Sequence, residues 1–194
     1  MQAIVIDSKN WNEKDKIITF ATPSGKEVAG FYGGRKHPLN SYLNLFTIGD
    51  FTIKEGKKIG TVKDCELIYY PDFSDWEKYI EASFLGELAC YLFLEKSEDQ
   101  EMFEVLKLVI EKFAVRNPHV LGFYGAVKML ELSGMLMENI DETTEAILQF
   151  PLSDDTAKMA VRNDYFQASR KNLIRHLDNL LNKRLNSVAY LGIF

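Results

Sequence analysis

The residues of this 194-residue chain best suited to catalysis or metal binding are three histidines and two cysteines, and they are widely separated. They are His37, His119, His176, Cys65 and Cys90. The cysteines form no Cys-x-x-Cys pair, so the clustered ligands of a structural zinc site are missing. The sequence also contains no nucleophile elbow, zinc-protease motif or P-loop. We therefore expect no catalytic residue, no metal and no cofactor, and we interpret both cysteines as small buried apolar residues.

Basic and aromatic residues near the N-terminus form a pattern typical of single-stranded nucleic-acid binding. Small β-barrels bind single strands by combining a basic groove with aromatic rings on which bases stack, at about 1–3 kcal/mol per base. The predicted DNA-binding residues are Lys9, Trp11, Lys14, Lys16, Lys26, Arg35 and Lys36. The alternative is an ordinary solvated surface for the lysines. For Phe31, Phe46 and Phe51 we expect positions in the barrel core.

The charge of the chain is unevenly distributed along the sequence. The formal net charge is −5. Residues 1–72 carry 10 basic and 9 acidic side chains, residues 73–164 carry 8 and 18, and residues 165–194 carry 5 and 1. The acidic middle would repel a polyanion, so any DNA-binding surface must be local.

The first 70 residues predict five short strands. Residues 2–8, 16–22, 27–32, 43–53 and 59–70 are rich in β-branched and aromatic residues and are separated by turn signals. One of these signals is Pro23-Ser24-Gly25-Lys26, where proline presets φ and glycine allows a positive φ. Five strands in this length favour a small closed barrel of the OB type.

After Tyr70-Pro71-Asp72 the apolar period becomes helical. The pair Ser74 and Glu77 forms a capping box that starts a first helix. A second helix is expected from near Ser97, and Asn117-Pro118 starts a third that stops near Gly134. Short helices are expected over 138–164, and a final helix over about 165–184 after an Asn163-Asp164 cap. We therefore predict an α+β chain, with an OB-type barrel over 1–72 and an all-helical domain over 73–194.

The final predicted helix carries an apolar stripe that includes two arginines. At 100° per residue, Arg170, Leu173, Leu177 and Arg184 lie on one face. Arginine can hold a carboxylate while neighbouring leucines contact apolar groups, which suits capture of an acidic, hydrophobic peptide end. The alternative is that both arginines extend outward from the edge of the core.

Three stretches in order along the chain carry a resemblance to a known family. The first is residues 3–26, from Ala3-Ile4-Val5-Ile6 to Thr22-Pro23-Ser24-Gly25-Lys26. The second is the loop Gly33-Gly34-Arg35-Lys36, which precedes Leu43-Asn44-Leu45-Phe46. The third is the last predicted helix and its end, from Arg170 to Ser187. Together they resemble the RecO recombination mediators. Many members carry a four-cysteine zinc ribbon after the third helix, but residues 135–160 here contain no cysteine.

The resemblance implies a non-enzymatic recombination mediator. Its expected ligand is single-stranded and also double-stranded DNA, whose complementary strands it would anneal. Its expected partners are RecR and the acidic tail of the single-stranded-DNA-binding protein SSB, with RecA loaded onto coated strands. Arg35 and Lys36 would contact DNA, and Arg170 and Arg184 would help receive the SSB tail. We expect a cytoplasmic, nucleoid-associated protein, because no apolar run is long enough to span a membrane.

Two other classes of function stay open. A protein adaptor would dock SSB or RecR and have little affinity for bare DNA. An enzyme would use the acidic clusters of the helical half, although these read as solvated helix faces. Salt dependence separates the first two classes, because direct contacts to phosphates release counterions.

Overall fold

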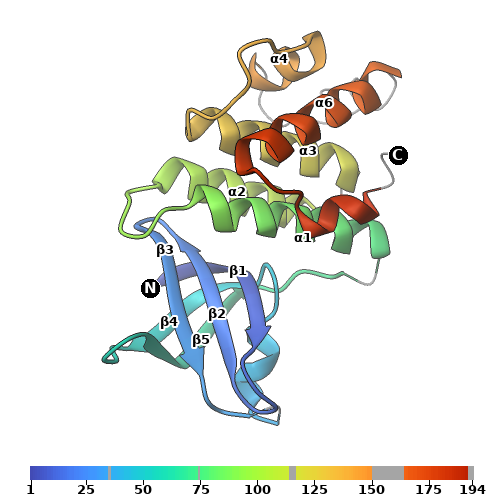
Figure 1. The fold of residues 1–194 in the computed structure, drawn as a ribbon. Coiled ribbons are helices and arrows are strands. Elements are labelled where there is room, and N and C mark those ends of the chain that lie inside the picture. The colour runs from blue at the N-terminus through green and yellow to red at the C-terminus, as the bar shows by residue number, and fades with distance from the viewer. Residues whose placement is uncertain (35, 74, 114–116, 150–163, 192–194) are drawn as a thin grey trace.

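The N-terminal part of the computed structural model is a closed five-stranded barrel in the order β1-β2-β3-β5-β4 (Figure 1). The structure describes residues 1–194 except 35, 74, 114–116, 150–163 and 192–194. The strands are β1 (Gln2–Asn10), β2 (Lys16–Thr22), β3 (Gly25–Phe31), β4 (Ile48–Lys54) and β5 (Gly60–Tyr69). Neighbouring strands pair antiparallel, except β3 and β5, which pair parallel. The predicted five-stranded barrel is confirmed.

Strand β1 is apolar on both faces because it lies between two cores. Ala3 and Val5 belong to the barrel core, whereas Ile4 and Ile6 belong to a larger core shared with the helices. Adjacent residues of a strand point to opposite faces, so the unbroken run Ala3–Ile6 is explained by burial on both sides. Phe31 and Phe51 lie in the barrel core as predicted, at 2% and 1% exposure.

The segment before β4 differs from the prediction of a strand starting at residue 43. The 3-10 helix η1 (Pro38–Tyr42) starts with the His37 side chain accepting a hydrogen bond from the Leu39 amide. Phe46 then adopts φ 63°, a left-handed conformation that interrupts an extended chain. Its ring is fully buried, but in the core shared with the helices, which corrects its predicted place in the barrel core.

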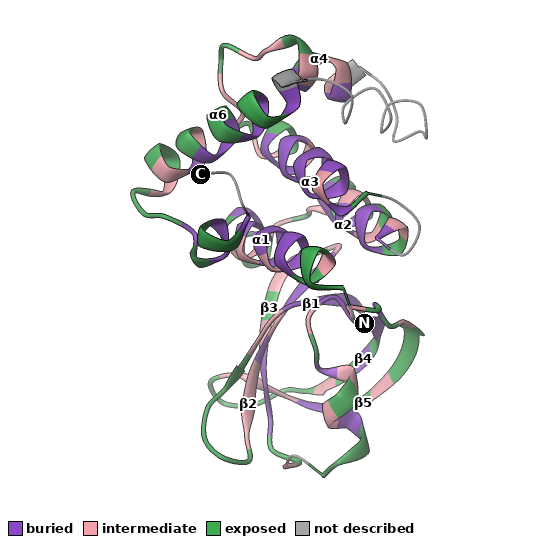
Figure 2. Cartoon of the chain, turned by 90° about the vertical axis from the view of Figure 1, so that its right-hand side faces the viewer, coloured by how far each residue is buried: buried purple, intermediate pink, exposed green. Residues whose placement is uncertain are grey.

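The C-terminal part is helical and lies against one side of the barrel (Figures 1 and 2). Its elements are α1 (Trp76–Leu92), α2 (Gln100–Lys112), α3 (Pro118–Leu132), α4 (Glu142–Gln149), α6 (Asp164–Leu181) and the 3-10 helix η2 (Asn186–Tyr190). Helices α1 and α3 are buried along much of their length (Figure 2). None of the described helices is long and apolar enough to cross a membrane.

Local capping sets most of the helix starts. The Asn117 side chain accepts from the amides of His119 and Val120, which confirms the predicted start of α3. Asp75 caps α1, whereas the predicted cap Ser74 lies outside the described residues, as does Asn163. Helix α2 is an exception: it starts three residues after Ser97, and Asp99 at its N-cap position makes no side-chain capping hydrogen bond.

The two halves share one continuous buried cluster. Ile4, Ile6 and Phe46 pack in the same core as the side chains of α1, α2 and α3. The backbones also approach closely, because a Cβ added at Gly86 of α1 would lie 2.9 Å from the carbonyl oxygen of Ile6. The strands end at Tyr69 and the helices begin at Trp76. The predicted domain boundary after residue 72 stays a prediction.

Candidate nucleic-acid interface

Two of the predicted DNA-binding lysines meet at the end of the barrel. Lys14 follows β1, and Lys36 follows β3 through a glycine pair. Together with Glu13, Gly33 and Gly34 they line a hollow of about 590 Å³, which we call the barrel hollow. Both lysine side chains are exposed. Arg35, predicted to bind DNA beside Lys36, lies outside the described residues.

The β1–β2 loop is held by its own hydrogen bonds. The Asn12 side chain accepts from the amides of Lys14 and Asp15, each at 2.8 Å, and donates to the Asp15 carboxylate at 2.7 Å. The Trp11 amide donates to the Asp15 carbonyl at 2.9 Å. The Trp11 side chain is 74% exposed on this ordered loop, as a base-stacking role requires.

Lys9 and Lys16 lie in a different place from Lys14 and Lys36. They face a surface between the barrel and the helices rather than the barrel hollow. The Lys9 ammonium is 2.6 Å from the Asp7 carboxylate, and hydrogen bonding to Asp7 raises the pKa of Lys9. Partial burial lowers the pKa of Lys16.

Lys26, also a predicted DNA contact, is hydrogen-bonded to the helical half of the chain. Its ammonium donates to the Cys90 carbonyl at 3.0 Å near the end of α1. Its backbone amide donates to the Leu94 carbonyl at 2.8 Å. Lys26 therefore links β3 to the end of α1 and to the segment that follows it, and its role as a DNA contact stays a prediction.

A large groove lies between the barrel and the helices, and the sequence did not predict it. It encloses about 1280 Å³ between the ends of β1 and β2, the connection after β5, α1 and η2. We call it the interdomain groove; its lining includes Lys9, Tyr70, Trp76, Tyr79, Tyr91 and Tyr190. The only signal in the sequence is the spacing of Tyr70, Trp76 and Tyr79, because Tyr190 joins them only through folding.

Most of the predicted SSB-tail site on α6 is buried and not exposed to solvent. Arg170 is 4% exposed, and Leu173 and Leu177 are each 1% exposed within the core. Helix α6 also ends at Leu181, so the exposed Arg184 lies beyond the helix and off the predicted stripe. The prediction of an exposed receiving face is therefore wrong for Arg170, Leu173 and Leu177.

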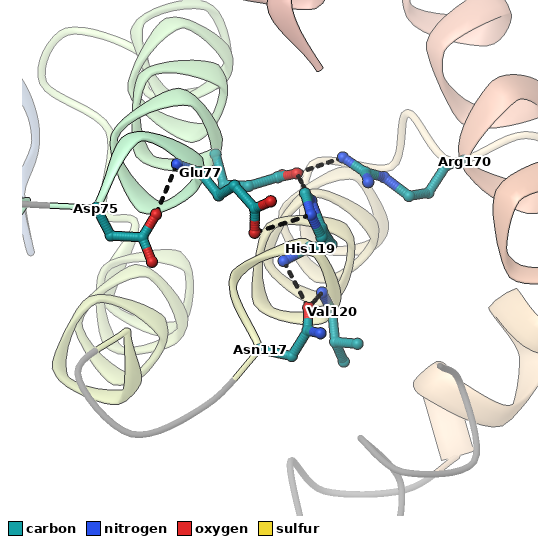
Figure 3. Close-up of polar contacts among 7 residues, drawn as sticks. Asp75, Glu77, Asn117, His119, Val120 and Arg170 are labelled. Carbon is teal, nitrogen blue, oxygen red and sulfur yellow. Dashed lines mark hydrogen bonds and ion pairs between the residues drawn. The ribbon is translucent and has the colours of Figure 1, made fainter. Parts of the chain in front are cut away.

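Arg170 is instead one partner of a buried carboxylate (Figure 3). Its guanidinium donates to Glu81 Oε1 at 2.5 Å, and His119 Nδ1 lies 2.6 Å from the same oxygen. Glu81 is 1% exposed. The other ring nitrogen of His119, Nε2, lies 3.5 Å from the Glu77 carboxylate. The cluster joins α1, α3 and α6, and its position inside the bundle indicates a structural role.

The cysteines do not form a reactive or metal-binding site. Cys65 and Cys90 are separate free thiols, and burial raises their pKa values to about 11 and about 12. Both are therefore protonated and poor nucleophiles near neutral pH. Across the described ranges, no group of three or more His, Cys, Asp or Glu side chains could hold a metal ion.

Comparison with known proteins agrees with this architecture. Residues 1–71 match the family model described as "Recombination protein O N terminal". Proteins named "DNA repair protein RecO" from Bacillus cereus strain B4264 and Bacillus anthracis strain CDC 684 / NRRL 3495 are 28% identical to this chain over 141 residues. These matches cover 70% of this chain and 57% of each relative. The chain thus spans little more than half the length of the curated relatives it matches.

Proposed function

We propose that this chain, which belongs to the RecO family, is a non-enzymatic DNA-binding mediator of recombination and DNA repair. One observation carries the proposal: the matched residues 1–71 form a closed barrel whose end brings Lys14 and Lys36 together at one hollow. The two cations offer phosphate contacts, and the exposed Trp11 on the same loop as Lys14 offers a ring on which a base can stack. We propose single-stranded DNA as the main ligand and duplex DNA as a second one.

We further propose that the chain anneals complementary strands and acts with RecR and SSB to load RecA, in the cytoplasm at the nucleoid. The names of the relatives support a role in DNA repair. For the SSB tail we assign no site to Arg170, Leu173 or Leu177, because these residues are buried. Arg184 is the member of the predicted set that lies at the surface.

The proposal is tested by fluorescence anisotropy of a labelled single-stranded oligonucleotide, titrated with the protein at several salt concentrations. Direct contacts to phosphates predict an affinity that falls steeply as salt rises, because counterions are released on binding. A duplex of the same length serves as the comparison ligand. Absence of binding even at low salt would remove direct DNA binding from the proposal.

The alternative function is a protein adaptor that docks SSB or RecR and has little direct affinity for DNA. The observation that favours it is the net charge of −5, with the negative charge concentrated in residues 73–164. Such a field weakens attraction of DNA at long range. An adaptor would bind immobilised RecR or SSB and leave the anisotropy of bare DNA unchanged at every salt concentration.

A further inference from the structure

Exposed aromatic side chains are concentrated in the interdomain groove. Among the described residues seven tryptophans and tyrosines are exposed, and five of them line this groove: Tyr70, Trp76, Tyr79, Tyr91 and Tyr190. The other two, Trp11 and Tyr32, lie within three residues of residues that line the barrel hollow. Exposed large apolar side chains gathered in one place indicate a binding surface.

We propose that the interdomain groove binds unstacked bases of single-stranded DNA, as a second contact region beyond the barrel hollow. The inference rests on the proposed function and adds to it a surface that would distinguish single-stranded DNA from duplex DNA. Bases in a duplex are already stacked on one another, so aromatic rings in a groove can receive only bases that have left the stack.

The aromatic rings are arranged as a preformed platform. Trp76 and Tyr79 stack with ring centroids 5.9 Å apart and an interplanar angle of 22°. Tyr190 of η2 meets Trp76 edge-on, with centroids 6.4 Å apart and an angle of 78°. Trp76 is still 63% exposed and Tyr190 65% exposed. Rings that hold one another lose little further freedom when a base stacks on them.

The charges of the groove favour bases over phosphates as the bound groups. Its lining contains three lysines and three carboxylates: Lys9, Lys16, Lys183, Asp7, Asp72 and Glu87. Lys9 is paired with Asp7, and Lys183 lies 4.4 Å from the centroid of the Tyr91 ring. The Glu87 carboxylate accepts four hydrogen bonds from Asn186 and Ser187. A balanced lining of this kind offers little net attraction to a polyanion, so affinity here must come from stacking.

The groove and the barrel hollow are lined by different parts of one hairpin. Lys9, Asn10 and Lys16, at the ends of β1 and β2, line the groove. Glu13 and Lys14, in the loop between the same strands, line the barrel hollow. A single strand whose phosphates lie at the hollow can therefore follow the β1–β2 hairpin and place its bases on Trp76.

The two tryptophans of the chain, Trp11 and Trp76, report on the two regions separately. In Trp11→Phe the remaining indole lies in the groove, and in Trp76→Phe it lies on the barrel loop. Each protein is titrated with an oligo-dT strand while selective excitation follows tryptophan emission, and anisotropy of a labelled strand independently defines saturation. We expect oligo-dT to quench Trp76 in Trp11→Phe, and the matching duplex to quench it far less.

A second pair of variants measures the contribution of the groove to affinity. Trp76→Ala and Tyr190→Ala are each expected to weaken single-strand binding by about 5- to 150-fold, which corresponds to one lost base stack. The slope of log K against log salt and the duplex affinity should stay near wild type, because no phosphate contact is lost. Leu94→Ala, which removes an exposed apolar side chain outside the groove, is the control and should bind as wild type.

The outcomes distinguish failure of the groove from failure of the proposed function. If anisotropy shows saturation while Trp76 emission in Trp11→Phe stays constant, the groove is not a base-binding site and the inference is overturned. Quenching of Trp76 by a short acidic, apolar peptide but not by saturating oligo-dT would overturn it in favour of protein docking. If no strand binds at any salt concentration, direct DNA binding itself is refuted, and the inference falls with it.

Discussion

The Arg170 guanidinium donates to the buried Glu81 carboxylate at 2.5 Å and so ties α6 to α1 across 89 residues of sequence. His119 of α3 lies 2.6 Å from the same carboxylate oxygen. One carboxylate thus joins three helices that are not consecutive in the sequence. A buried charge depends strongly on its partner, because neither water nor a distant charge can replace it.

Replacing Arg170 with Met should destabilise the protein by about 3–5 kcal/mol, because the Glu81 carboxylate would be left buried without its strongest partner. Urea unfolding followed by circular dichroism measures the loss. Arg175→Met on the same helix is the matched control, since Arg175 is exposed and its loss should change stability by no more than about 0.5 kcal/mol. The double variant Glu81→Met/Arg170→Met should regain part of the lost stability. Equal stability of Arg170→Met and Arg175→Met would contradict the assigned role.

The sequence predicts the strands and helices well but not the use of the α6 stripe. Apolar periodicity is a local signal, so it correctly placed Leu173 and Leu177 on one face with Arg170. It cannot tell whether an arginine on that face meets solvent or a buried acid 89 residues away. The same limit applies to Trp76 and Tyr190, which come together only once α1 and η2 have packed.

Lys14→Ala/Lys36→Ala should weaken binding of single-stranded DNA and lower the salt slope of log K by about one to two units, because two phosphate contacts are lost. Anisotropy titrations over a series of salt concentrations give both quantities. The control Lys57→Ala/Lys58→Ala removes the same charge from the turn between β4 and β5, outside both the barrel hollow and the interdomain groove. If the two double variants lose affinity equally, the effect comes from net charge and not from the barrel hollow.

Glu87→Gln should make the stability of the protein less sensitive to acid. Burial alone would raise the pKa of Glu87, but hydrogen bonds from Ser187 and Asn186 together lower it below its ordinary value of 4.5. A carboxyl with a lowered folded-state pKa contributes stability above its unfolded pKa and loses that contribution as pH falls through the folded value. Urea unfolding at neutral pH and at several pH values below 4.5 should show a shallower decline in the variant. A decline as steep as that of wild type would show that Glu87 is not a source of the acid sensitivity.

Gly122→Ala should have opposite effects in two backgrounds, which tests how firmly the buried Glu81 is held. A Cβ at position 122 of α3 would overlap Glu81 Oε2 and approach its Cδ to 3.1 Å. The Glu81 side chain cannot move aside without losing Arg170 and His119, so the substitution should cost about 1–3 kcal/mol in the wild-type protein. In Glu81→Ala/Arg170→Met the obstruction is gone, and the helix propensity of alanine should make the same change stabilising by about 0.8–1 kcal/mol. Urea unfolding of the four proteins measures both effects, and a cost of similar size in both backgrounds would show that something other than Glu81 limits the space beside Gly122.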